Sequence, residues 1–178
     1  MFLLTAILGV TMSRKPGSMY RYVRGQVSTR REYMGGIPAS RITQFVAGNK
    51  QATFPIKLSL VANEQCQIRH NALESARITV NRVMEKKVGA ANFRLHIHSY
   101  PHVVLRENKQ ATGAGADRVS QGMRAAYGKI VSTAARVKEN QTIMTIETTE
   151  SFVSEAKTAL RKAGMKVPAP CTVNIENT

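Results

Sequence analysis

Hydrophobic positions recur with helical spacing in two segments of the chain. Over residues 71–87 apolar side chains return every three to four positions, and Gly89 follows, so we expect an amphipathic helix that ends there. A similar pattern predicts a helix over residues 151–163, ended by Gly164. The inward positions are predicted to be Ala72, Leu73, Ala76, Val80, Val83 and Met84 in the first helix, and Phe152, Val153, Ala156, Leu160 and Ala163 in the second.

Other segments alternate between apolar and polar residues, as strands do. The clearest is residues 93–98, where Phe93, Leu95 and Ile97 alternate with charged or imidazole side chains. A short helix is predicted over residues 117–127, with Asp117 as its N-cap and Gly128 as its stop. Because strands and helices mix without strict alternation, the predicted fold class is α+β. The predicted strands are residues 41–47, 54–61, 93–98, 102–106, 130–137, 142–148 and 171–175.

The chain is strongly basic. It has 178 residues, with 26 Lys+Arg against 11 Asp+Glu, a formal net charge of +15, and 43% hydrophobic residues. This hydrophobic content excludes a disordered basic tail, and a folded protein with such an excess of charge is typical of nucleic-acid binding. The cations cluster in residues 14–41 and 106–138. Arginine dominates the first cluster, which suits forked contacts to phosphate.

The chain divides into three predicted parts. Residues 1–11 are uncharged and too short to span a bilayer, so we expect Met12 to be the true start or residues 1–11 to be a disordered extension. Residues 12–38 are expected to form a basic arm, and residues 39–178 a single globular α+β domain. Cys66 and Cys171 belong to no CxxC motif, which indicates buried thiols in a reduced, intracellular protein. The arm's tyrosines (Tyr20, Tyr22 and Tyr33) suit either stacking on bases or anchoring of the arm to the core.

A glycine-bearing basic loop is predicted at residues 106–117. Gly113 and Gly115 would let the backbone approach a crowded anionic partner, and Arg106, Lys109 and Arg118 flank them. The glycines resemble part of a dinucleotide-binding fingerprint, but Arg118 stands where the third glycine belongs. An enzyme that binds a nucleotide there is a competing hypothesis, although no nucleophile and base pair is apparent.

The histidines do not make a convincing metal site. His96 and His98 should share one strand face, with His102 nearby, but Arg94 and Arg106 are their charged neighbours. We therefore expect surface or RNA-facing histidines, no metal and no cofactor. His70 precedes a helix beside Arg69, which indicates a capping or phosphate-binding role.

A series of motifs in fixed order resembles a known family. From Met12 nearly to its end, the chain is similar to the archaeal and eukaryotic "ten-e" large-subunit ribosomal proteins, whose bacterial counterpart is large-subunit protein sixteen. The archaeal form is more similar, because the chain lacks the longer eukaryotic tail. The family usually has a glycine where Ser132 stands. The motifs are Arg14-Lys15-Pro16, Met19-Tyr20-Arg21-Tyr22, Thr29-Arg30-Arg31-Glu32-Tyr33, Phe54-Pro55, Arg69-His70-Asn71-Ala72-Leu73-Glu74, Tyr100-Pro101-His102-Val103-Val104-Leu105-Arg106, Ala114-Gly115-Ala116-Asp117-Arg118, Gly122-Met123-Arg124, Gly128-Lys129, Thr133-Ala134-Ala135-Arg136-Val137 and Lys166-Val167-Pro168.

The resemblance implies a structural protein of the large ribosomal subunit, in the cytoplasm, and no enzyme. Its fold would be a hammerhead-type sandwich of a mixed or antiparallel sheet and helices. It would bind ribosomal RNA near the central protuberance and the aminoacyl-tRNA path, with the loop directed toward the peptidyl-transferase region. Its partners would be large-subunit ribosomal RNA, tRNA and neighbouring ribosomal proteins, but no membrane and no small-molecule substrate. The alternative is a free RNA-binding or ribosome-assembly factor.

Specific residues follow from the charge clusters and the resemblance together. The residues expected to bind RNA are Arg14, Lys15, Tyr20, Arg21, Arg24, Arg30, Arg31, Arg69, His70, Arg118, Arg124, Lys129 and Arg136, and those expected in the loop that faces tRNA are Arg106, Asn108, Lys109, Gly113 and Gly115.

Overall fold

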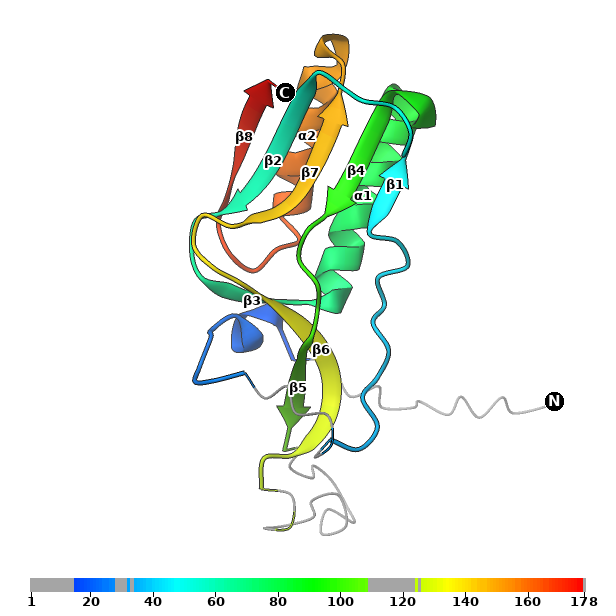
Figure 1. The fold of residues 1–178 in the computed structure, drawn as a ribbon. Coiled ribbons are helices and arrows are strands. Elements are labelled where there is room, and N and C mark those ends of the chain that lie inside the picture. Colours follow the sequence, from blue (N-terminus) through cyan, green and yellow to red (C-terminus); the bar gives the residue numbers. More distant parts are fainter. Residues whose placement is uncertain (1–14, 28–31, 33, 109–123, 125, 178) are drawn as a thin grey trace, which may run out of the picture.

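Two antiparallel sheets and two α-helices make up the fold in the computed structural model, which describes residues 15–27, 32, 34–108, 124 and 126–177 (Figure 1). The five-stranded sheet has the order β1-β4-β7-β2-β8, and the three-stranded sheet has the order β3-β6-β5. The predicted α+β class is confirmed. The strands are β1 (Val46–Gly48), β2 (Ile56–Ala62), β3 (Cys66–Arg69), β4 (Phe93–Ile97), β5 (Val103–Glu107), β6 (Lys129–Val137), β7 (Thr142–Thr148) and β8 (Cys171–Asn177); the helices are α1 (His70–Lys87) and α2 (Val153–Gly164), with 3-10 turns η1 (Gly17–Tyr20), η3 (Ala90–Asn92) and η6 (Glu150–Phe152).

Both helices cover the same face of the five-stranded sheet and pack against each other (Figure 1). The apolar positions of β2, β4 and β7 face them, and Leu58, Leu95 and Ile146 align in register across the three strands. All three are fully buried, together with Leu73, Val80 and Met84 of α1 and Ala156 and Leu160 of α2. The helical patterns in the sequence therefore identified the core face of both helices. Gly164 is the last residue of α2 and not the residue after it.

The smaller sheet extends the fold at the lower end of Figure 1. Cys66 and Ile68 of β3 and Ala135 and Val137 of β6 are buried and join the main core. β3 runs directly into α1, since Arg69 ends the strand and His70 begins the helix. The strand β3 was not predicted, because a four-residue alternation beside a polar turn is too short to stand out.

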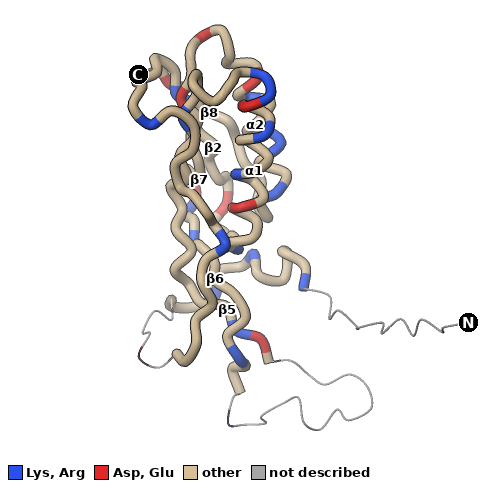
Figure 2. The backbone as a smooth tube through the Cα atoms, turned by 90° about the vertical axis from the view of Figure 1, so that its right-hand side faces the viewer, with Lys and Arg blue, Asp and Glu red and all other residues tan. Residues whose placement is uncertain are grey.

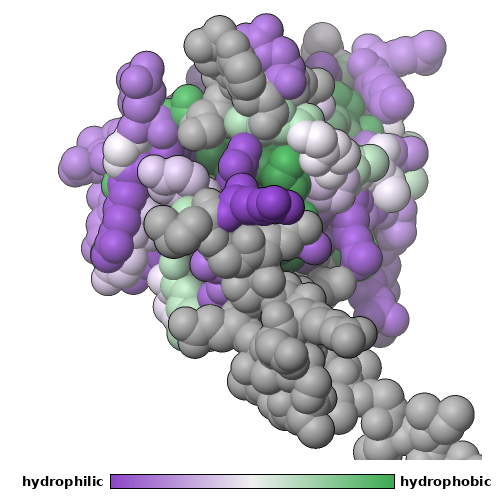
Figure 3. Space-filling model, turned by 90° about the horizontal axis from the view of Figure 1, so that it is seen from below, coloured by the Kyte–Doolittle hydropathy of each residue, from purple (hydrophilic) through white to green (hydrophobic). Residues whose placement is uncertain are grey.

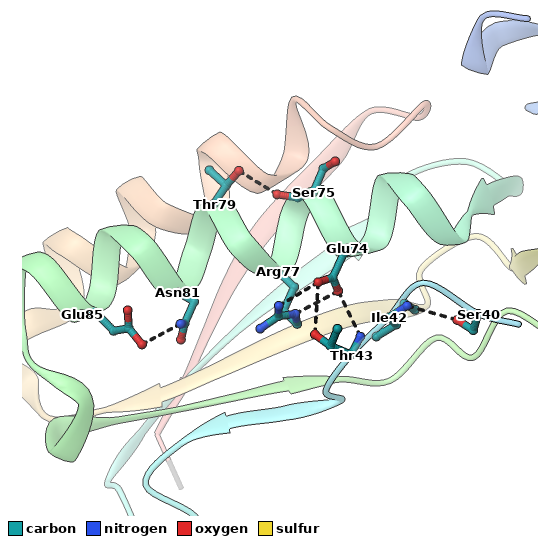
Figure 4. Close-up of polar contacts among 9 residues, drawn as sticks. All are labelled: Ser40, Ile42, Thr43, Glu74, Ser75, Arg77, Thr79, Asn81 and Glu85. Carbon is teal, nitrogen blue, oxygen red and sulfur yellow. Dashed lines mark hydrogen bonds and ion pairs between the residues drawn. The ribbon is translucent and has the colours of Figure 1, made fainter. Parts of the chain in front are cut away.

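The predicted strand at residues 41–47 was wrong for most of its length. Only Val46–Gly48 pairs, with β4. In the preceding residues the backbone N–H groups donate to side chains. That of Arg41 donates to His70 Nδ1, and that of Thr43 donates to Glu74 Oε2 (Figure 4). Because these donors are already used, the segment follows α1 and not a neighbouring strand.

An ion pair fixes that segment to the helix. Arg77 donates to both carboxylate oxygens of Glu74, at 2.7 and 2.9 Å, and Thr43 Oγ1 donates to Glu74 Oε1 at 3.2 Å (Figure 4). The hydrogen bonds from Arg77 hold the pKa of the Glu74 carboxyl below its ordinary value of 4.5. Although Arg77 is a charged residue of an amphipathic helix, its side chain is only 13% exposed because it serves this anchor.

The helix predicted over residues 117–127 is not supported where it can be assessed. Arg124 is in a 3-10 conformation, and Ala126 and Tyr127 form a turn. Gly128 follows with a φ of +83°, and an added Cβ there would overlap the backbone of Glu107 and Asn108. The chain thus needs a close, left-handed turn at this point to enter β6, which a continuing helix would not allow. Asp117 and residues 118–123 lie outside the described residues.

Candidate nucleic-acid interface

Residues 15–27, called here the arm segment, pack against the three-stranded sheet along β3, which is its edge strand. The backbone N–H of Gln67 donates to the Arg21 carbonyl at 2.9 Å. The Gln67 side-chain amide donates to the carbonyls of Tyr22, at 3.0 Å, and Tyr20, at 3.4 Å. One residue of β3 therefore binds three consecutive residues of the arm segment. Sequence analysis missed Gln67, and its only indication was the brief alternation of Cys66 and Ile68 with polar neighbours.

Two arginines of the same sheet also hold the arm segment. Arg136 donates to the carbonyls of Gly25, at 2.9 Å, and Arg24, at 3.3 Å. Arg69 donates to the Lys15 carbonyl at 3.0 Å, and its guanidinium lies 5.2 Å from the centre of the Tyr20 ring. Both side chains, which were predicted to bind RNA, thus donate to the protein's own backbone. They keep their positive charge beneath the arm segment.

The two described tyrosines of the arm differ in position. Tyr20 is half-buried, and its hydroxyl is enclosed without a hydrogen-bond partner among the described residues. Tyr22 is 67% exposed, with the Arg21 guanidinium 6.0 Å from its ring centre. Tyr20 therefore anchors the arm segment to the rest of the protein, whereas the ring of Tyr22 is available to a partner. Arg21 itself is paired with Glu64.

The arm segment with β3, β5 and β6 forms one end of the molecule, which we call the arm-bearing end, and it carries exposed cations, as do the helices α1 and α2 (Figure 2). Viewed from below, hydrophilic side chains dominate its described surface, with hydrophobic areas between them (Figure 3). Arg106 was expected in the loop, but it is in β5, paired with Ile130. Asn108 comes directly after β5, and its side-chain amide donates to the Ala126 carbonyl at 3.4 Å. Among the described residues of the arm-bearing end, the exposed cations include Lys15, Arg24, Arg106, Arg124 and Lys129.

Several predicted site residues cannot be placed. Arg14, Arg30, Arg31, Lys109, Gly113, Gly115 and Arg118 lie outside the described residues, and so do Tyr33 and residues 1–13.

His70 links α1 to the small sheet. Its ring is buried, and Nδ1 accepts from the backbone N–H of Arg41 at 3.3 Å and lies 3.1 Å from Thr133 Oγ1. This arrangement leaves Nε2 as the protonated nitrogen, 3.3 Å from Ser132 Oγ. Ser132 lies within β6 and has no positive φ, so this position does not require the glycine that the resemblance led us to expect. His70 thus positions the β5–β6 hairpin from inside the protein.

His96 of β4 and His98, which follows that strand, lie on the face of the large sheet opposite the helices, whereas His102 lies just before β5 of the small sheet. The rings of His96 and His98 are 4.2 Å apart between centres, and His98 Nε2 lies 3.0 Å from Thr145 Oγ1. Burial, and then the charge of His96, lower the pKa of His98. His102 Nδ1 lies 3.1 Å from the Tyr100 carbonyl. Over the described part of the chain, no group of three or more His, Cys, Asp or Glu residues is arranged to hold a metal ion.

Both cysteines are free thiols, as predicted. Cys66 is buried, and burial raises its pKa. Cys171 is half-buried in the space between α2 and β8, and burial raises its pKa to about 11. Within the residues that the structure describes, neither helix combines the length and hydrophobicity that a membrane span requires.

Comparison with known proteins gives one consistent result. Residues 23–174 match the family described as "Ribosomal protein L16p/L10e". The chain is 56% identical over 165 residues to a protein of Methanosphaerula palustris, covering 93% of this chain and 95% of that protein. It is 54% identical over 164 residues to a protein of Thermoplasma volcanium, covering 92% and 93%. Both relatives are named "Large ribosomal subunit protein uL16".

Proposed function

Because the chain belongs to the ribosomal protein L16p/L10e family, we propose that it binds large-subunit ribosomal RNA through its arm-bearing end. As a member of this family it is an archaeal-type structural constituent of the large subunit, in the cytoplasmic ribosome, and not an enzyme. We propose that its role is to hold RNA in place.

The observation that carries the proposal is the arrangement of cations around a fixed backbone. Lys15, Arg24, Arg124 and Lys129 present their charges to solvent, while Arg69 and Arg136 fix the arm segment from beneath. Contacts of this kind neutralise phosphates and set the orientation of a protein on RNA without reading its sequence. Because the arm segment is already attached to the sheet, it loses less conformational entropy on binding than a free basic tail would.

The proposed location is near the central protuberance and the aminoacyl-tRNA path, with tRNA as a second partner. The family resemblance supports this location. The hairpin of β5 and β6 carries Arg106 and Asn108 at the base of the predicted loop, so it gives the loop a rigid support. Glycines within the loop would allow it to enter a crowded RNA cavity. Arg14, Arg30, Arg31, Lys109 and Arg118 are proposed to add contacts of the same electrostatic kind.

The salt dependence of binding tests the proposal. Affinity of the full chain for large-subunit ribosomal RNA should fall steeply as salt rises, because phosphate contacts release counterions. Replacing Arg24, Arg124 and Lys129 together by glutamine should reduce the slope of log K against log salt by up to about 2 to 3.

The matched control removes equal charge from the end of α1 that points away from the small sheet. Arg82, Lys86 and Lys87 are exposed cations near that end, and their replacement by glutamine should change the slope much less. Salt-independent binding, or equal effects of the two triple variants, would contradict an interface at the arm-bearing end.

A further inference from the structure

We propose that a cavity between the arm segment and the small sheet is a slot for one unstacked base of the bound RNA. The cavity has a volume of about 380 Å³. Tyr22, Met19, Arg24 and Gln26 of the arm segment line one side, and Val103 and Arg136 of the sheet line the other. This inference rests on the proposed RNA-binding function and adds a defined ligand to it.

The slot offers surfaces on which an aromatic base can stack. Tyr22 is 67% exposed and Met19 is 66% exposed, although both belong to a segment fixed to the sheet. The Gln67 amide binds the Tyr22 carbonyl, so the backbone that carries the ring is held before RNA arrives. An exposed yet positioned aromatic ring gains stacking energy without a large ordering cost.

The polar groups of the slot also suit a nucleotide. Gln26 is exposed, and its amide both donates and accepts, as the edges of a base require. Arg24 is exposed and carries the charge that the phosphate attached to the base would need. None of the described residues that line the cavity is acidic. A polyanion therefore approaches this slot without repulsion.

A base fits the slot better than a phosphate alone does. The two terminal nitrogens of Arg136 already donate to carbonyls of the arm segment, so its fork is not available for bidentate phosphate binding. The phenol ring of Tyr22 and the thioether of Met19 contribute apolar surface, which a phosphate cannot use. Sequence-tolerant recognition of RNA commonly relies on bases that leave their stack and rest on aromatic side chains.

Two substitutions at one position test the slot. In the full chain, Tyr22→Leu keeps an apolar side chain but removes the aromatic face, and Tyr22→Phe keeps that face. Tyr22→Leu should weaken binding to large-subunit ribosomal RNA by about five- to 100-fold, with the salt slope unchanged because no phosphate contact is lost. Tyr22→Phe should bind within about twofold of the wild type. Unchanged thermal unfolding of both variants would show that the fold is intact, as the exposure of Tyr22 leads us to expect.

Ultraviolet cross-linking of the wild-type complex, followed by mass spectrometry, gives a second readout. A nucleotide attached within the arm segment at or beside Tyr22 supports the slot. If Tyr22→Leu binds as the wild type does and no such cross-link forms, the slot is wrong, although a retained salt slope would leave the proposed function intact. Absence of salt-dependent binding in the wild type would instead overturn the proposed function itself.

Discussion

Gln67 of β3 lies directly opposite Arg136 of β6, and the two side chains hold the same stretch of the arm segment. Gln67 binds the carbonyls of Tyr20 and Tyr22, and Arg136 binds those of Arg24 and Gly25. A cross-strand pair thus fixes four carbonyls of a segment that forms no strand of its own. The arm segment is positioned by the sheet before any RNA is bound.

Arg136→Lys should loosen the arm segment while leaving the core unchanged. Lysine keeps the charge but lacks the planar fork that binds two carbonyls at once. The backbone N–H of Gln67, which donates to the Arg21 carbonyl, should exchange its hydrogen about tenfold faster. This factor corresponds to a decrease of about 1.4 kcal/mol in the free energy of local opening. Hydrogen exchange measured by NMR checks this, with Leu95 in the core as an internal reference.

Arg161→Lys is the control for that substitution. Arg161 is an exposed residue of α2 that lines neither cavity formed by the arm segment, so its replacement should leave Gln67 exchange unchanged. Equal exchange of Gln67 in Arg136→Lys and the wild type would mean that Arg136 does not hold the arm segment.

Glu74→Gln should lower the free energy of unfolding by about 1–2 kcal/mol at neutral pH, because Arg77 and Thr43 lose a charged acceptor. The pKa of Glu74 is lowered in the folded protein, so its charge contributes stability fully above its ordinary pKa of 4.5. That contribution is lost as pH falls through the lower, folded-state pKa. The difference between wild type and variant should therefore shrink below pH 4.5, as urea unfolding at several pH values would reveal.

Glu85→Gln provides the comparison on the same helix. Glu85 is exposed and accepts from the Asn81 amide at 2.7 Å, without a bidentate arginine. Its replacement should change stability by about 0.5 kcal/mol or less. Similar losses for both variants, or a Glu74 effect that does not depend on pH, would refute the anchoring role of Glu74.

Gly128→Ala should destabilise the protein more than Gly89→Ala does. Both glycines have positive φ angles, +83° and +86°, so alanine is strained at either position. At Gly89 no atom lies within 4 Å of the added Cβ, and we expect a cost of about 1 kcal/mol. At Gly128 the Cβ would overlap the backbone of Glu107 and Asn108, so the cost should at least double. Equal unfolding free energies for the two variants would show that the hairpin accommodates a side chain at this turn.

The thiol of Cys171 should react slowly in the folded protein. Its pKa is raised to about 11 from an ordinary 9.0, so its thiolate fraction near pH 8 is about a hundredfold lower than that of an unshifted thiol. Iodoacetamide labelling at pH 8 should therefore be slow until urea unfolds the chain, after which both cysteines should label. Rapid labelling of the native protein would contradict the observed burial.

Sequence periodicity predicted the parts of the fold that depend on burial. The helical spacing in residues 71–87 predicted α1, and the alternation around Leu95 predicted β4. Both patterns arise because one face of the helix, and one face of the strand, contacts the core along its length. The hydrophobic pattern also predicted a strand over residues 41–47, but residues 41–45 do not form one. There Thr43 and Arg41 bind the side chains of Glu74 and His70, which no local pattern reveals.

The candidate site was harder to predict, because its geometry depends on contacts between distant residues. The family resemblance predicted Arg69, and charge clustering predicted Arg136, as RNA-binding residues, but neither indicated that both donate to carbonyls of the arm segment. Gln67 is uncharged, so charge did not indicate it, and the alternation of Cys66 and Ile68 around it is too short to predict a strand. Its role appears only when β3 and residues 20–22 are adjacent in space.

Cross-linking of RNA to protein in purified large subunits would show whether RNA binds at the arm-bearing end. This chain should be present at about one copy per subunit, with nucleotides attached to the arm segment and to the β5–β6 hairpin. Cross-links confined to α2 and β8, with none in residues 15–27 or in β5 and β6, would contradict an RNA interface at the arm-bearing end.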